Sequence, residues 1–401
     1  MATVAQQSIM ADPRIREANV TVPVYKQLPF VPERASGCDI FTKDGRRILD
    51  LYGGHAVAAL GYGHPQLVKA ITEQSNQLLF QSNAVALEIR AQAAEKLTQV
   101  APQGLDRVFF VNSGAEANEN ALRMACKTTE RKKVLAITQG FHGRTAAAAT
   151  VTWNSDRWYG FPSKPFEVDF IPRDDIAAAQ AMIDGDVAAV IFEPVQGVAG
   201  AYDLWTEFLT ALRVETSKHN AILIADEVQS GIGRCGQFFA VQTHGIEPDI
   251  LTSAKALGGG VPCGAVLCSH AIAAKFGPGD LGSTFGGGPL AAAAIAATID
   301  VIINEDLLMN VRRCEAAIRE KCIIGPVTRI QGMGLLLGLV CDRPAIEVRD
   351  ALLEHDILAG TSGDPEVLRI LPPLVLEPGH IDHLAEALRD VAPATDYRNK
   401  W

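Results

Sequence analysis

Short apolar runs rich in β-branched residues recur between about residues 60 and 300, where they alternate with longer stretches of helical pattern. This alternation predicts an α/β chain in which a mostly parallel sheet is wrapped by helices. Polar residues flank the runs and mark where each strand is expected to end. The expected strands are Val108–Val111, Val134–Thr138, Phe166–Ile171, Ala188–Phe192, Ala221–Ala225, Ile250–Ser253 and Ala265–Cys268.

The pattern changes outside this region, which indicates a second, smaller α+β domain. Helix-like segments such as NVRRCEAAIREKC and AIEVRDALLEHD follow residue 305 together with short strands, and a last helix ends the chain. Before residue 60, CDIFTKDG and RRILDL are expected to pair through a turn at Asp44-Gly45. We expect residues 1–60 to join the small domain, residues 61–304 to form the large domain, and residues 305–401 to form the C-terminal small domain.

Composition favours a small-molecule partner. The 36 basic and 46 acidic residues give a net charge of −10, which repels nucleic acid and anionic lipid surfaces. The eight cysteines show no CxxC pair and no zinc-site spacing, so we expect reduced, buried thiols and no metal. The N-terminus MATVAQQSIMADPRIREAN has no signal-peptide pattern, and no apolar span reaches 18 residues. A cytoplasmic protein that does not enter the membrane is expected.

Ligands of open α/β sheets bind beyond the carboxyl ends of the strands, so the residues that follow each run are candidates for a site. In RVFFVNSGAEANENALRMA, Ser113-Gly114-Ala115 opens a helix, and Ser113 with Glu116 matches a capping box. The exposed amides of such a helix start favour an anion, above all a phosphate. An ordinary capped helix is the alternative for this segment.

A second strand end carries two consecutive carboxylates. AILIADEVQSGIGRCG places Asp226 and Glu227 after an apolar run, where a carboxylate can bind a metal, act as a base or pair with a ring nitrogen; structural capping is the alternative. The glycines of GIGRCG match a dinucleotide fingerprint in letters. That interpretation is rejected, because they lie several residues past the strand and open no helix.

The third strand end is PDILTSAKALGGGVPCGAV, in which Lys255 follows the strand and precedes three glycines. Burial at the edge of an apolar sheet lowers the pKa of a lysine and frees its amine to attack carbonyl groups. A solvated surface lysine is the alternative. The neighbouring alanine, leucine and glycine residues offer no partner that would explain a structural lysine.

The fourth end, TQGFHGRTAAAATVT, presents Phe141, His142 and Arg144. An aromatic side chain can stack on a flat ring, and an arginine can bind a carboxylate through two hydrogen bonds. The four ends thus offer a phosphate site, a carboxylate for a ring nitrogen, a reactive amine and a stacking face. Pyridoxal 5'-phosphate is the common cofactor that requires all four.

The segments SGAEANENALRMA, GFHGRT, EPVQG, DEVQSGIGR, SAKALGGGVPCGA and STFGGGPLAAAA resemble, in order and spacing, those of class III (ornithine-type) aminotransferases. The similarity extends over about residues 15 to 392. It implies the type I, aspartate-aminotransferase-like fold and a homodimer with shared active sites. In such enzymes Lys255 would hold the cofactor as a Schiff base and shuttle a proton, and Asp226 would pair with the pyridine nitrogen. The expected cofactor-binding residues are Ser113, Gly114, Ala115, Phe141, Asp226, Glu227, Val228, Gln229, Lys255 and Thr284, the last reaching the partner's phosphate site.

The resemblance also implies how substrates are bound. Arg369 matches the arginine for an α-carboxylate and Arg144 the one for a distal carboxylate. Glu193 matches the residue that pairs with Arg369 during the half-reaction of an amine that has no carboxylate beside its reacting carbon, and Ser283 matches one that contacts the partner's substrate. The stretch GGHAVAALG departs from the pattern at His55 and Ala58, where relatives commonly carry an aliphatic residue and asparagine.

The implied reaction is transfer of the δ-amino group of N2-acetyl-L-ornithine to 2-oxoglutarate, as in arginine biosynthesis. Succinylornithine, ornithine, 4-aminobutyrate and carrier-linked lysine are alternative amines. Rearrangement of glutamate 1-semialdehyde is an alternative reaction on the same scaffold. A nucleotide-binding dehydrogenase and a non-catalytic metabolite-binding protein are less well supported, the latter because the lysine and the aspartate are both intact.

Overall fold

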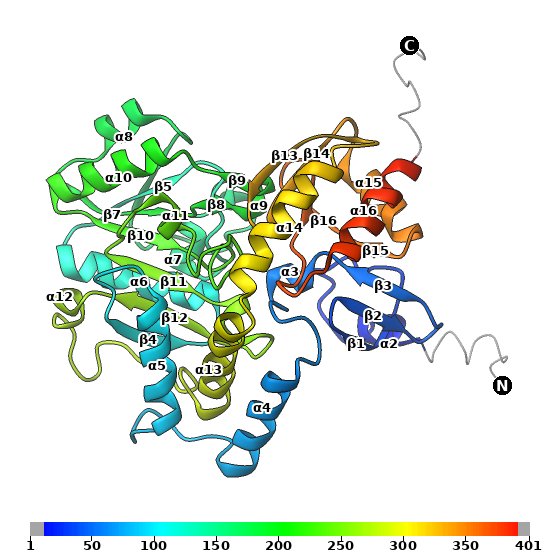
Figure 1. Cartoon of the computed structure of the whole chain (residues 1–401). Coiled ribbons are helices and arrows are strands. Elements are labelled where there is room, and N and C mark those ends of the chain that lie inside the picture. Colours follow the sequence, from blue (N-terminus) through cyan, green and yellow to red (C-terminus); the bar gives the residue numbers. More distant parts are fainter. Residues whose placement is uncertain (1–11, 392–401) are drawn as a thin grey trace.

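The computed structural model describes residues 12–391 and contains a seven-stranded sheet built from the seven expected strands (Figure 1). The order is β4-β12-β11-β10-β7-β5-β6. Six strands run in the same direction, and β12 is antiparallel to both of its neighbours. The bounds are β4 Arg107–Val111, β5 Lys133–Ile137, β6 Glu167–Ile171, β7 Val187–Phe192, β10 Ile222–Asp226, β11 Ile250–Ser253 and β12 Gly264–Cys268.

Both faces of this sheet are covered, which explains why its strands are apolar throughout. Alternate residues of β5 belong to different cores: Val134 and Ala136 pack in the cluster that includes α6 (Gly114–Thr129). Leu135 and Ile137 pack in the cluster that includes α10 (Thr206–His219). A parallel sheet between two helical layers directs the carboxyl ends of its strands to one edge, where the loops are free to bind a ligand.

The remaining helices cover the sheet or link it to the smaller part of the chain. Helix α13 packs on α4, α5 and α14, so it joins the two parts (Figure 1). The helices and single turns are α2 Pro13–Ala18, α3 Gly53–Ala56, α4 Pro65–Gln77, α5 Glu88–Val100, α7 Ala146–Thr150, η1 Ser155–Arg157, α8 Ile176–Met182, α9 Gly197–Gly200, α11 Val241–His244, η2 Lys255–Gly258, α12 His270–Ala273, α13 Pro289–Asn304, α14 Leu307–Lys321, α15 Ala345–Glu354 and α16 Pro378–Asp390.

Two four-stranded sheets lie on the other side of α13 (Figure 1). One contains β1 Pro32–Ser36, β2 Asp39–Thr42, β3 Arg47–Asp50 and β15 Ile357–Leu358. Because β15 pairs with β3, the N-terminal strands share a sheet with a C-terminal strand. The other contains β13 Val327–Met333, β14 Leu336–Cys341, β17 Val367–Ile370 and β16 Gly360–Thr361, and a separate pair is formed by β8 Val195–Gln196 and β9 Tyr202–Asp203. The domain limits at 60/61 and 304/305 stay a prediction, and their outer ends, 1–11 and 392–401, lie outside the described residues.

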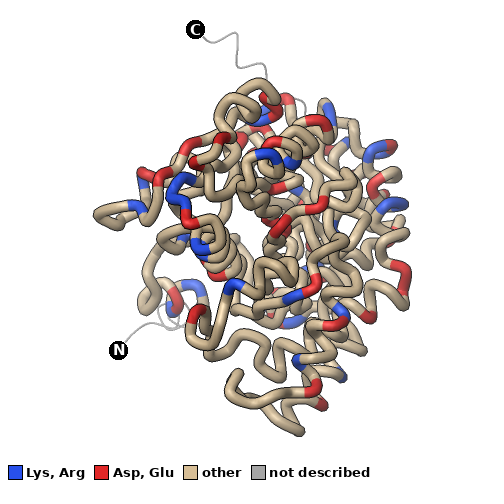
Figure 2. Tube along the Cα trace, turned by 90° about the vertical axis from the view of Figure 1, so that its left-hand side faces the viewer, with Lys and Arg blue, Asp and Glu red and all other residues tan. Residues whose placement is uncertain are grey.

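The cysteines of the fold are free thiols, and its charges are of mixed sign. All eight cysteines are free, and burial raises the pKa of thiols such as those of Cys38 and Cys263 to about 12. Acidic and basic residues are interspersed along the trace (Figure 2). Between residues 12 and 391, no cluster of three or more His, Cys, Asp or Glu residues could hold a metal ion. No helix in that range has the length and apolar character needed to cross a bilayer.

Candidate active site

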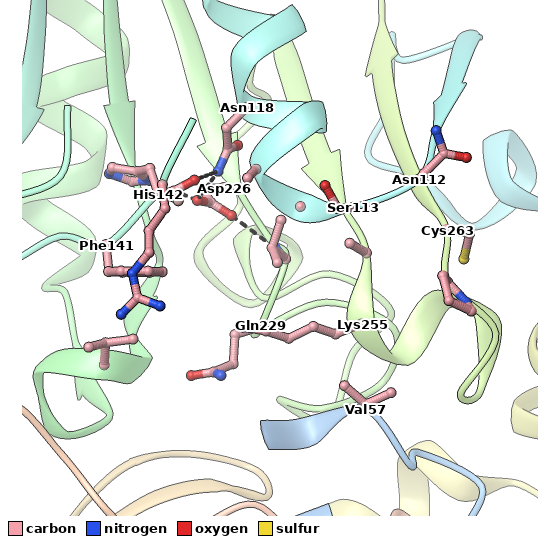
Figure 3. Close-up of a pocket in the computed structure, with 18 of the residues that line it drawn as sticks. Val57, Asn112, Ser113, Asn118, Phe141, His142, Asp226, Gln229, Lys255 and Cys263 are labelled. Carbon is pink, nitrogen blue, oxygen red and sulfur yellow. Dashed lines mark hydrogen bonds and ion pairs between the residues drawn. The ribbon is translucent and has the colours of Figure 1, made fainter. Parts of the chain in front are cut away.

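A cavity of about 620 Å³ opens at the carboxyl ends of the large sheet's strands (Figure 3). Residues from all four strand ends singled out in the sequence line it, so segments spread over more than a hundred residues converge on one site. The expected site residues in its wall are Ser113, Gly114, Ala115, Phe141, Arg144, Glu193, Asp226, Val228, Gln229 and Lys255.

Lys255 begins η2 directly after β11, and its side chain extends into the cavity beside Gln229 (Figure 3). Its backbone has φ of 44°, a left-handed conformation that is uncommon for a residue with a side chain. Burial lowers the pKa of the Lys255 amine to about 8, although the nearby carboxylates of Asp226 and Glu193 act in the opposite direction. An appreciable share of the amine is therefore neutral near physiological pH, which is the form that attacks a carbonyl carbon.

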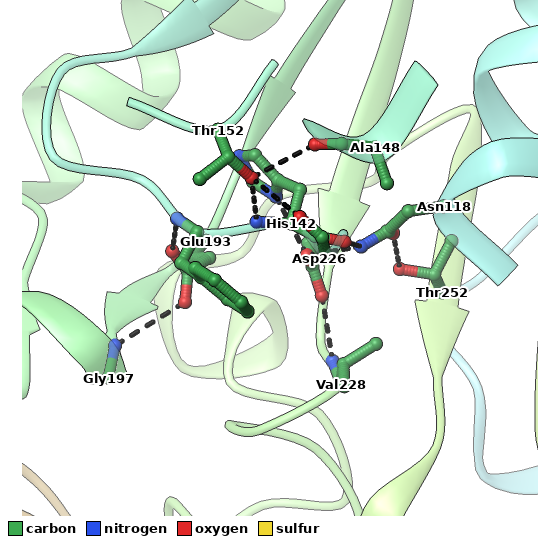
Figure 4. Close-up of polar contacts among 11 residues, drawn as sticks. Asn118, His142, Ala148, Thr152, Glu193, Gly197, Asp226, Val228 and Thr252 are labelled. Carbon is green, nitrogen blue, oxygen red and sulfur yellow. Dashed lines mark hydrogen bonds and ion pairs between the residues drawn. The ribbon is translucent and has the colours of Figure 1, made fainter. Parts of the chain in front are cut away.

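Asp226, the last residue of β10, is fixed by a buried network (Figure 4). Its Oδ2 lies 2.7 Å from Nδ1 of His142 and accepts a 2.7 Å hydrogen bond from the Asn118 amide. The backbone N–H of Val228 donates to Oδ1 at 3.0 Å. Asn118 also accepts from the hydroxyl of Thr252 at 2.7 Å, so the network spans two strands and α6. Such a carboxylate has a fixed direction and resists displacement.

Asn118 and His142 were missed as site residues by the sequence reasoning. Asn118 lies on the face of α6 that packs on the sheet, and it is buried beside Ala117, Ala121 and Leu122. A lone amide on an otherwise apolar helix face needs a hydrogen-bond partner, and this was the signal available in the sequence. No comparable signal separates His142 from an ordinary loop histidine.

The start of α6 has the form of an anion site. The Ser113 hydroxyl caps the helix by accepting the N–H of Glu116 at 3.2 Å. The expected reciprocal half of a capping box is shifted by one residue, because the Glu116 carboxylate accepts the N–H of Asn112 at 2.8 Å. A Cβ at Gly114 would lie 2.6 Å from Val228 Cγ1, so only glycine allows Val228 to pack against the helix start. The first amides of α6 thus remain open to a bound phosphate.

Phe141 and Arg144 stand on the opposite wall of the cavity. Phe141 is half-buried, and its N–H donates to Oε1 of Glu193 at 2.8 Å. The exposed guanidinium of Arg144 lies 5.7 Å from the Phe141 ring centroid and 5.6 Å from that of Trp158. The Arg144 guanidinium therefore lies near two aromatic rings, and its charge remains accessible to the carboxylate of a ligand.

Glu193 and Arg369 lie near each other without forming an ion pair. Glu193 is buried, which raises the pKa of its carboxyl to about 7, and it accepts hydrogen bonds from Phe141 and Gly197. Arg369 is buried on β17 and donates to Thr361 O, Gly197 O and Tyr52 Oη at 2.8, 3.1 and 2.9 Å. No Asp or Glu among residues 12–391 lies within 4.0 Å of its guanidinium. The charge of Arg369 is thus left for a ligand.

Four expected site residues are not part of the cavity wall: Arg369, described above, and Glu227, Ser283 and Thr284. Glu227 faces away from it, because its carboxylate accepts from the Ser230 hydroxyl and from the N–H of Val241. The Ser283 hydroxyl accepts from Asn112 of its own chain at 3.1 Å. Thr284 is exposed on the surface. The glycines at 231, 233 and 236 precede no helix until α11, which agrees with the rejection of a dinucleotide fingerprint.

These features define a pyridoxal-phosphate enzyme of the type I fold. The lysine has a lowered pKa, the aspartate at the neighbouring strand end is held in place, and the start of α6 is open to an anion. The model of the family "Aminotransferase class-III" matches residues 21–392. The chain belongs to the class III aminotransferases and uses pyridoxal 5'-phosphate.

Named relatives agree with this assignment. The acetylornithine aminotransferase of Neisseria meningitidis serogroup A is 39% identical over 386 residues, which cover 92% of this chain and 96% of that protein. That of Methanopyrus kandleri is 40% identical, with 92% and 95% covered. The chain is also similar to the crystal structure of ornithine aminotransferase from Toxoplasma gondii, which contains the cofactor at partial occupancy, with a TM-score of 0.89, 26% identity and 98% of each chain covered. For acetylornithine aminotransferase from Elizabethkingia anophelis the TM-score is 0.84, with 31% identity and 94% and 97% covered.

Proposed function

We propose that this aminotransferase transfers the δ-amino group of N2-acetyl-L-ornithine to 2-oxoglutarate, which yields N-acetyl-L-glutamate 5-semialdehyde and L-glutamate. The observation that carries the proposal is the buried guanidinium of Arg369 beside Lys255, which has no carboxylate partner among the described residues. An unpaired buried charge is costly, so it favours a substrate whose carboxylate lies next to the reacting carbon. Glutamate and 2-oxoglutarate are such substrates. The choice of N2-acetyl-L-ornithine as the amine rests on the similarity to the acetylornithine aminotransferases named above.

The residues of the cavity fit the cofactor. Lys255 would hold it covalently, Asp226 would pair with its ring nitrogen, and the amides of Ser113, Gly114 and Ala115 would bind its phosphate. Val228 and Phe141 would flank its ring. When bound, pyridoxal phosphate withdraws electrons from the substrate carbon. Lys255 would then move the proton between the substrate carbon and the cofactor.

Gln229 adds a further point of fit. Its Oε1 is buried and has no hydrogen-bond partner among the described residues. Buried side-chain oxygens are normally paired, so an orphaned one on a cavity wall favours a polar ligand group beside it. We assign to Gln229 the phenolic oxygen of the cofactor. Glu227 is left out of the proposed contacts, because its carboxylate is already bound to Ser230 and Val241.

Two arginines would receive the two carboxylates of glutamate, Arg369 the α-carboxylate and Arg144 the distal one. Acetylornithine presents no carboxylate beside its δ-carbon, so Arg369 would then require another partner. Burial lowers the pKa of the Arg369 guanidinium, and the nearby Glu193 carboxyl acts in the opposite direction. Its own carboxyl, with a pKa of about 7, can gain or lose its proton near neutral pH. We propose that Glu193 ionises and turns toward Arg369 only in that half-reaction.

A homodimer would complete the site. Exposed apolar side chains surround the segment that carries Ser283 and Thr284, and the rings of Phe80 and Phe285 lie 5.1 Å apart. An apolar surface of this kind favours burial against a second copy. Thr284, exposed in the single chain, would then reach the phosphate site of the partner. The exposed residues are Leu78, Leu79, Phe80, Val85 and Phe285.

The free thiols are consistent with a cytoplasmic enzyme of arginine biosynthesis.

Half-reaction spectroscopy tests the proposal. Holoenzyme is mixed with one amine at a time without keto acid, and loss of the visible cofactor band gives kcat/KM for each. Acetylornithine should exceed succinylornithine, ornithine, 4-aminobutyrate and a carrier-linked lysine by about tenfold or more, which corresponds to roughly 1.4 kcal/mol. A faster alternative amine would refute the substrate but keep the reaction class. Repeated turnover of glutamate 1-semialdehyde without keto acid would instead support an aminomutase.

A further inference from the structure

The turn that follows β3 directs two side chains toward Arg369. The Tyr52 hydroxyl accepts a 2.9 Å hydrogen bond from Nη2 of Arg369, which lies 317 residues later in the chain. The same oxygen is 2.8 Å from Nδ1 of His55, and the two rings are 4.7 Å apart and tilted. Arg369, Tyr52 and His55 therefore form a continuous hydrogen-bonded chain that ends on the arginine.

The direction of this chain follows from the chemistry of its members. A guanidinium only donates, so the Tyr52 oxygen must accept from Arg369. The single hydroxyl proton then goes to His55, and Nδ1 of His55 must be the unprotonated nitrogen. Without an acceptor at His55, the hydroxyl proton could rotate toward Arg369 and meet a like-signed group. His55 thus fixes the orientation of the Tyr52 hydroxyl.

The number of donors on Arg369 is informative. The guanidinium has five N–H groups. Thr361 O, Gly197 O and the Tyr52 hydroxyl take one each. Among residues 12–391 no partner takes the other two N–H groups, and two is the number that a carboxylate uses in a bidentate pair. All three existing partners are uncharged, so they hold the guanidinium without neutralising it.

The turn that carries His55 is strained and firmly held. Gly53, Gly54, His55 and Ala56 all have left-handed φ values, 56°, 57°, 66° and 65°. This costs about 1–2 kcal/mol for each residue with a Cβ. The Asp50 carboxylate holds the turn by accepting the N–H groups of Tyr52 and Gly53 at 2.8 and 2.9 Å. Such conformations persist only where surrounding contacts impose them, and they cluster at functional sites.

The charges around His55 keep it neutral. Burial lowers the pKa of its imidazole, and the positive charges of Arg369 on β17 and Lys255 on η2 lower it further. Tyr52 on the same turn is the other titratable group in contact with it, and Asp50 at the end of β3 acts on Tyr52. Above the lowered pKa the ring keeps the unprotonated Nδ1 that the Tyr52 hydroxyl needs. As the pH falls through that value, the ring gains a proton there and loses its role as acceptor.

We propose that Tyr52 and His55 are positioning residues for Arg369: together they fix its guanidinium through an uncharged contact and leave two N–H groups free for the α-carboxylate of the substrate. The inference rests on the proposed function in one respect, namely that a carboxylate binds at Arg369. It adds two residues to the substrate site that act through the arginine and touch no reacting atom.

The test compares the binding of glutarate, a dicarboxylate that cannot react, to holoenzyme variants by calorimetry. Tyr52→Phe removes the acceptor and should raise the Kd of glutarate about tenfold, the usual size of a hydrogen bond to a charged group. The glutamate half-reaction should lose a similar factor in kcat/KM, while the acetylornithine half-reaction changes much less. Unchanged glutarate affinity in Tyr52→Phe would overturn the proposal.

Two substitutions at His55 separate positioning from structure. His55→Phe keeps a ring of similar size but offers no acceptor, and it should weaken glutarate binding several-fold. His55→Gln retains an oxygen that can accept the Tyr52 proton and should restore most of the affinity. Tyr62→Phe is the matched control. Tyr62 donates a 2.6 Å hydrogen bond to Asp50, which holds the same turn, but it has no hydrogen bond to Arg369 among the described residues. The glutarate affinity of this variant should equal that of the wild type.

A second readout follows the imidazole itself. The hydrogen bond from Tyr52 stabilises neutral His55, so Tyr52→Phe should raise the pKa of the ring, as measured by NMR titration of the holoenzyme. Equal losses in both half-reactions, with His55→Gln no better than His55→Phe, would indicate a merely structural turn and overturn the proposal. Glutarate binding does not depend on the amine. A different amine would therefore refute the proposed function and leave this result standing.

Discussion

On one side of the cavity, Lys255, Asp226 and Ser113 each lie within two residues of the end of a strand of the large sheet. In a second group, Arg369 belongs to a separate sheet, is not among the residues that line the cavity and meets Tyr52 across 317 residues, while Glu193 lines the cavity and follows β7. We call the first group the cofactor side and the second, Tyr52, Glu193 and Arg369, the substrate side. The cofactor side is fixed by sheet topology, as is the place of Glu193, whereas the positions of Tyr52 and Arg369 depend on how the smaller part of the chain packs on the large sheet. Substitutions on the cofactor side should therefore slow both half-reactions, and substitutions on the substrate side should slow only one.

The largest effect is expected for Lys255→Ala. Without the amine, neither the covalent bond to the cofactor nor the proton transfer is possible, so both half-reactions should fall by roughly 10⁴-fold or more. The visible cofactor band should be lost, and stopped-flow absorbance measures both effects. Lys275→Ala, at an exposed lysine, is the control. Turnover close to that of the wild type would remove Lys255 from the mechanism.

The next largest effect is expected for Asp226→Ala. Loss of the ring-nitrogen partner should leave some cofactor bound and reduce kcat about 10³-fold in both half-reactions. Asn118→Ala removes only one of the hydrogen bonds to Oδ2 and should cost about tenfold. Paired half-reaction kinetics measures both variants. A kcat near normal in Asp226→Ala would exclude its assigned role, and a loss limited to one half-reaction would break the distinction between the two sides.

On the substrate side, Arg369→Ala should reduce kcat/KM for glutamate about 10²-fold, because a desolvated carboxylate loses its charged partner. The acetylornithine half-reaction should lose less than about tenfold. Arg369→Lys keeps the positive charge but cannot bind a carboxylate through two parallel hydrogen bonds. It should therefore recover only part of the kcat/KM that Arg369→Ala loses. The same kinetic assay applies to each variant, and equal losses in the two half-reactions would contradict the assignment.

The smallest effect concerns Glu193 and pH. Burial raises the pKa of this carboxyl to about 7 from an ordinary value of 4.5. The folded protein therefore keeps a proton there that the unfolded chain has already lost, and this carboxyl destabilises the fold increasingly as the pH rises from about 4.5 to 7. Above that range the penalty is constant at up to about 3 kcal/mol, the equivalent of the shift.

Glu193→Gln keeps the shape of the protonated carboxyl and removes its charge. The variant should match the wild type in free energy of unfolding near pH 4, exceed it increasingly up to about pH 7, and hold a constant advantage above that. Urea unfolding at several pH values measures this difference, with the exposed Glu247→Gln as control. An advantage that does not vary with pH would mean that the carboxyl titrates at its ordinary value.

The cofactor side could be predicted from the sequence because local signals determine it. All seven strands of the large sheet were expected, and Lys255, Asp226 and the Ser113–Ala115 segment could be placed at strand ends without knowing the pairing order. The antiparallel direction of β12 could not be read, because an apolar run has the same pattern in either direction. The reciprocal bond of Glu116 was assigned one residue away from its actual partner, since both amides lie within reach.

The substrate side was accessible only through family resemblance. Nothing in VLRILPPL indicates that Arg369 meets Tyr52, because their contact depends on the packing of β17 against the turn after β3. The left-handed conformation of His55 and Ala56 is equally hidden, since it is uncommon for any residue with a side chain and an alanine gives no sign of it. The pairing of Glu193 with Arg369 during the acetylornithine half-reaction stays a prediction; in the structure the Glu193 carboxylate accepts from backbone N–H groups, and no pattern in EPVQG indicates these contacts.

The position of β12 has a consequence for biosynthesis. Strand β4 lies at the edge of the sheet, and within the described part of the chain it pairs only with β12, which is about 150 residues further along. During synthesis, β4 and the helix start at Ser113 therefore cannot pair with β12 until Cys268 has left the ribosome. By then β5, β6, β7, β10 and β11 have already been made. Because β12 pairs with both β11 and β4, η2 and the start of α6 come to lie at the same edge of the sheet only after residues 264–268 have been made.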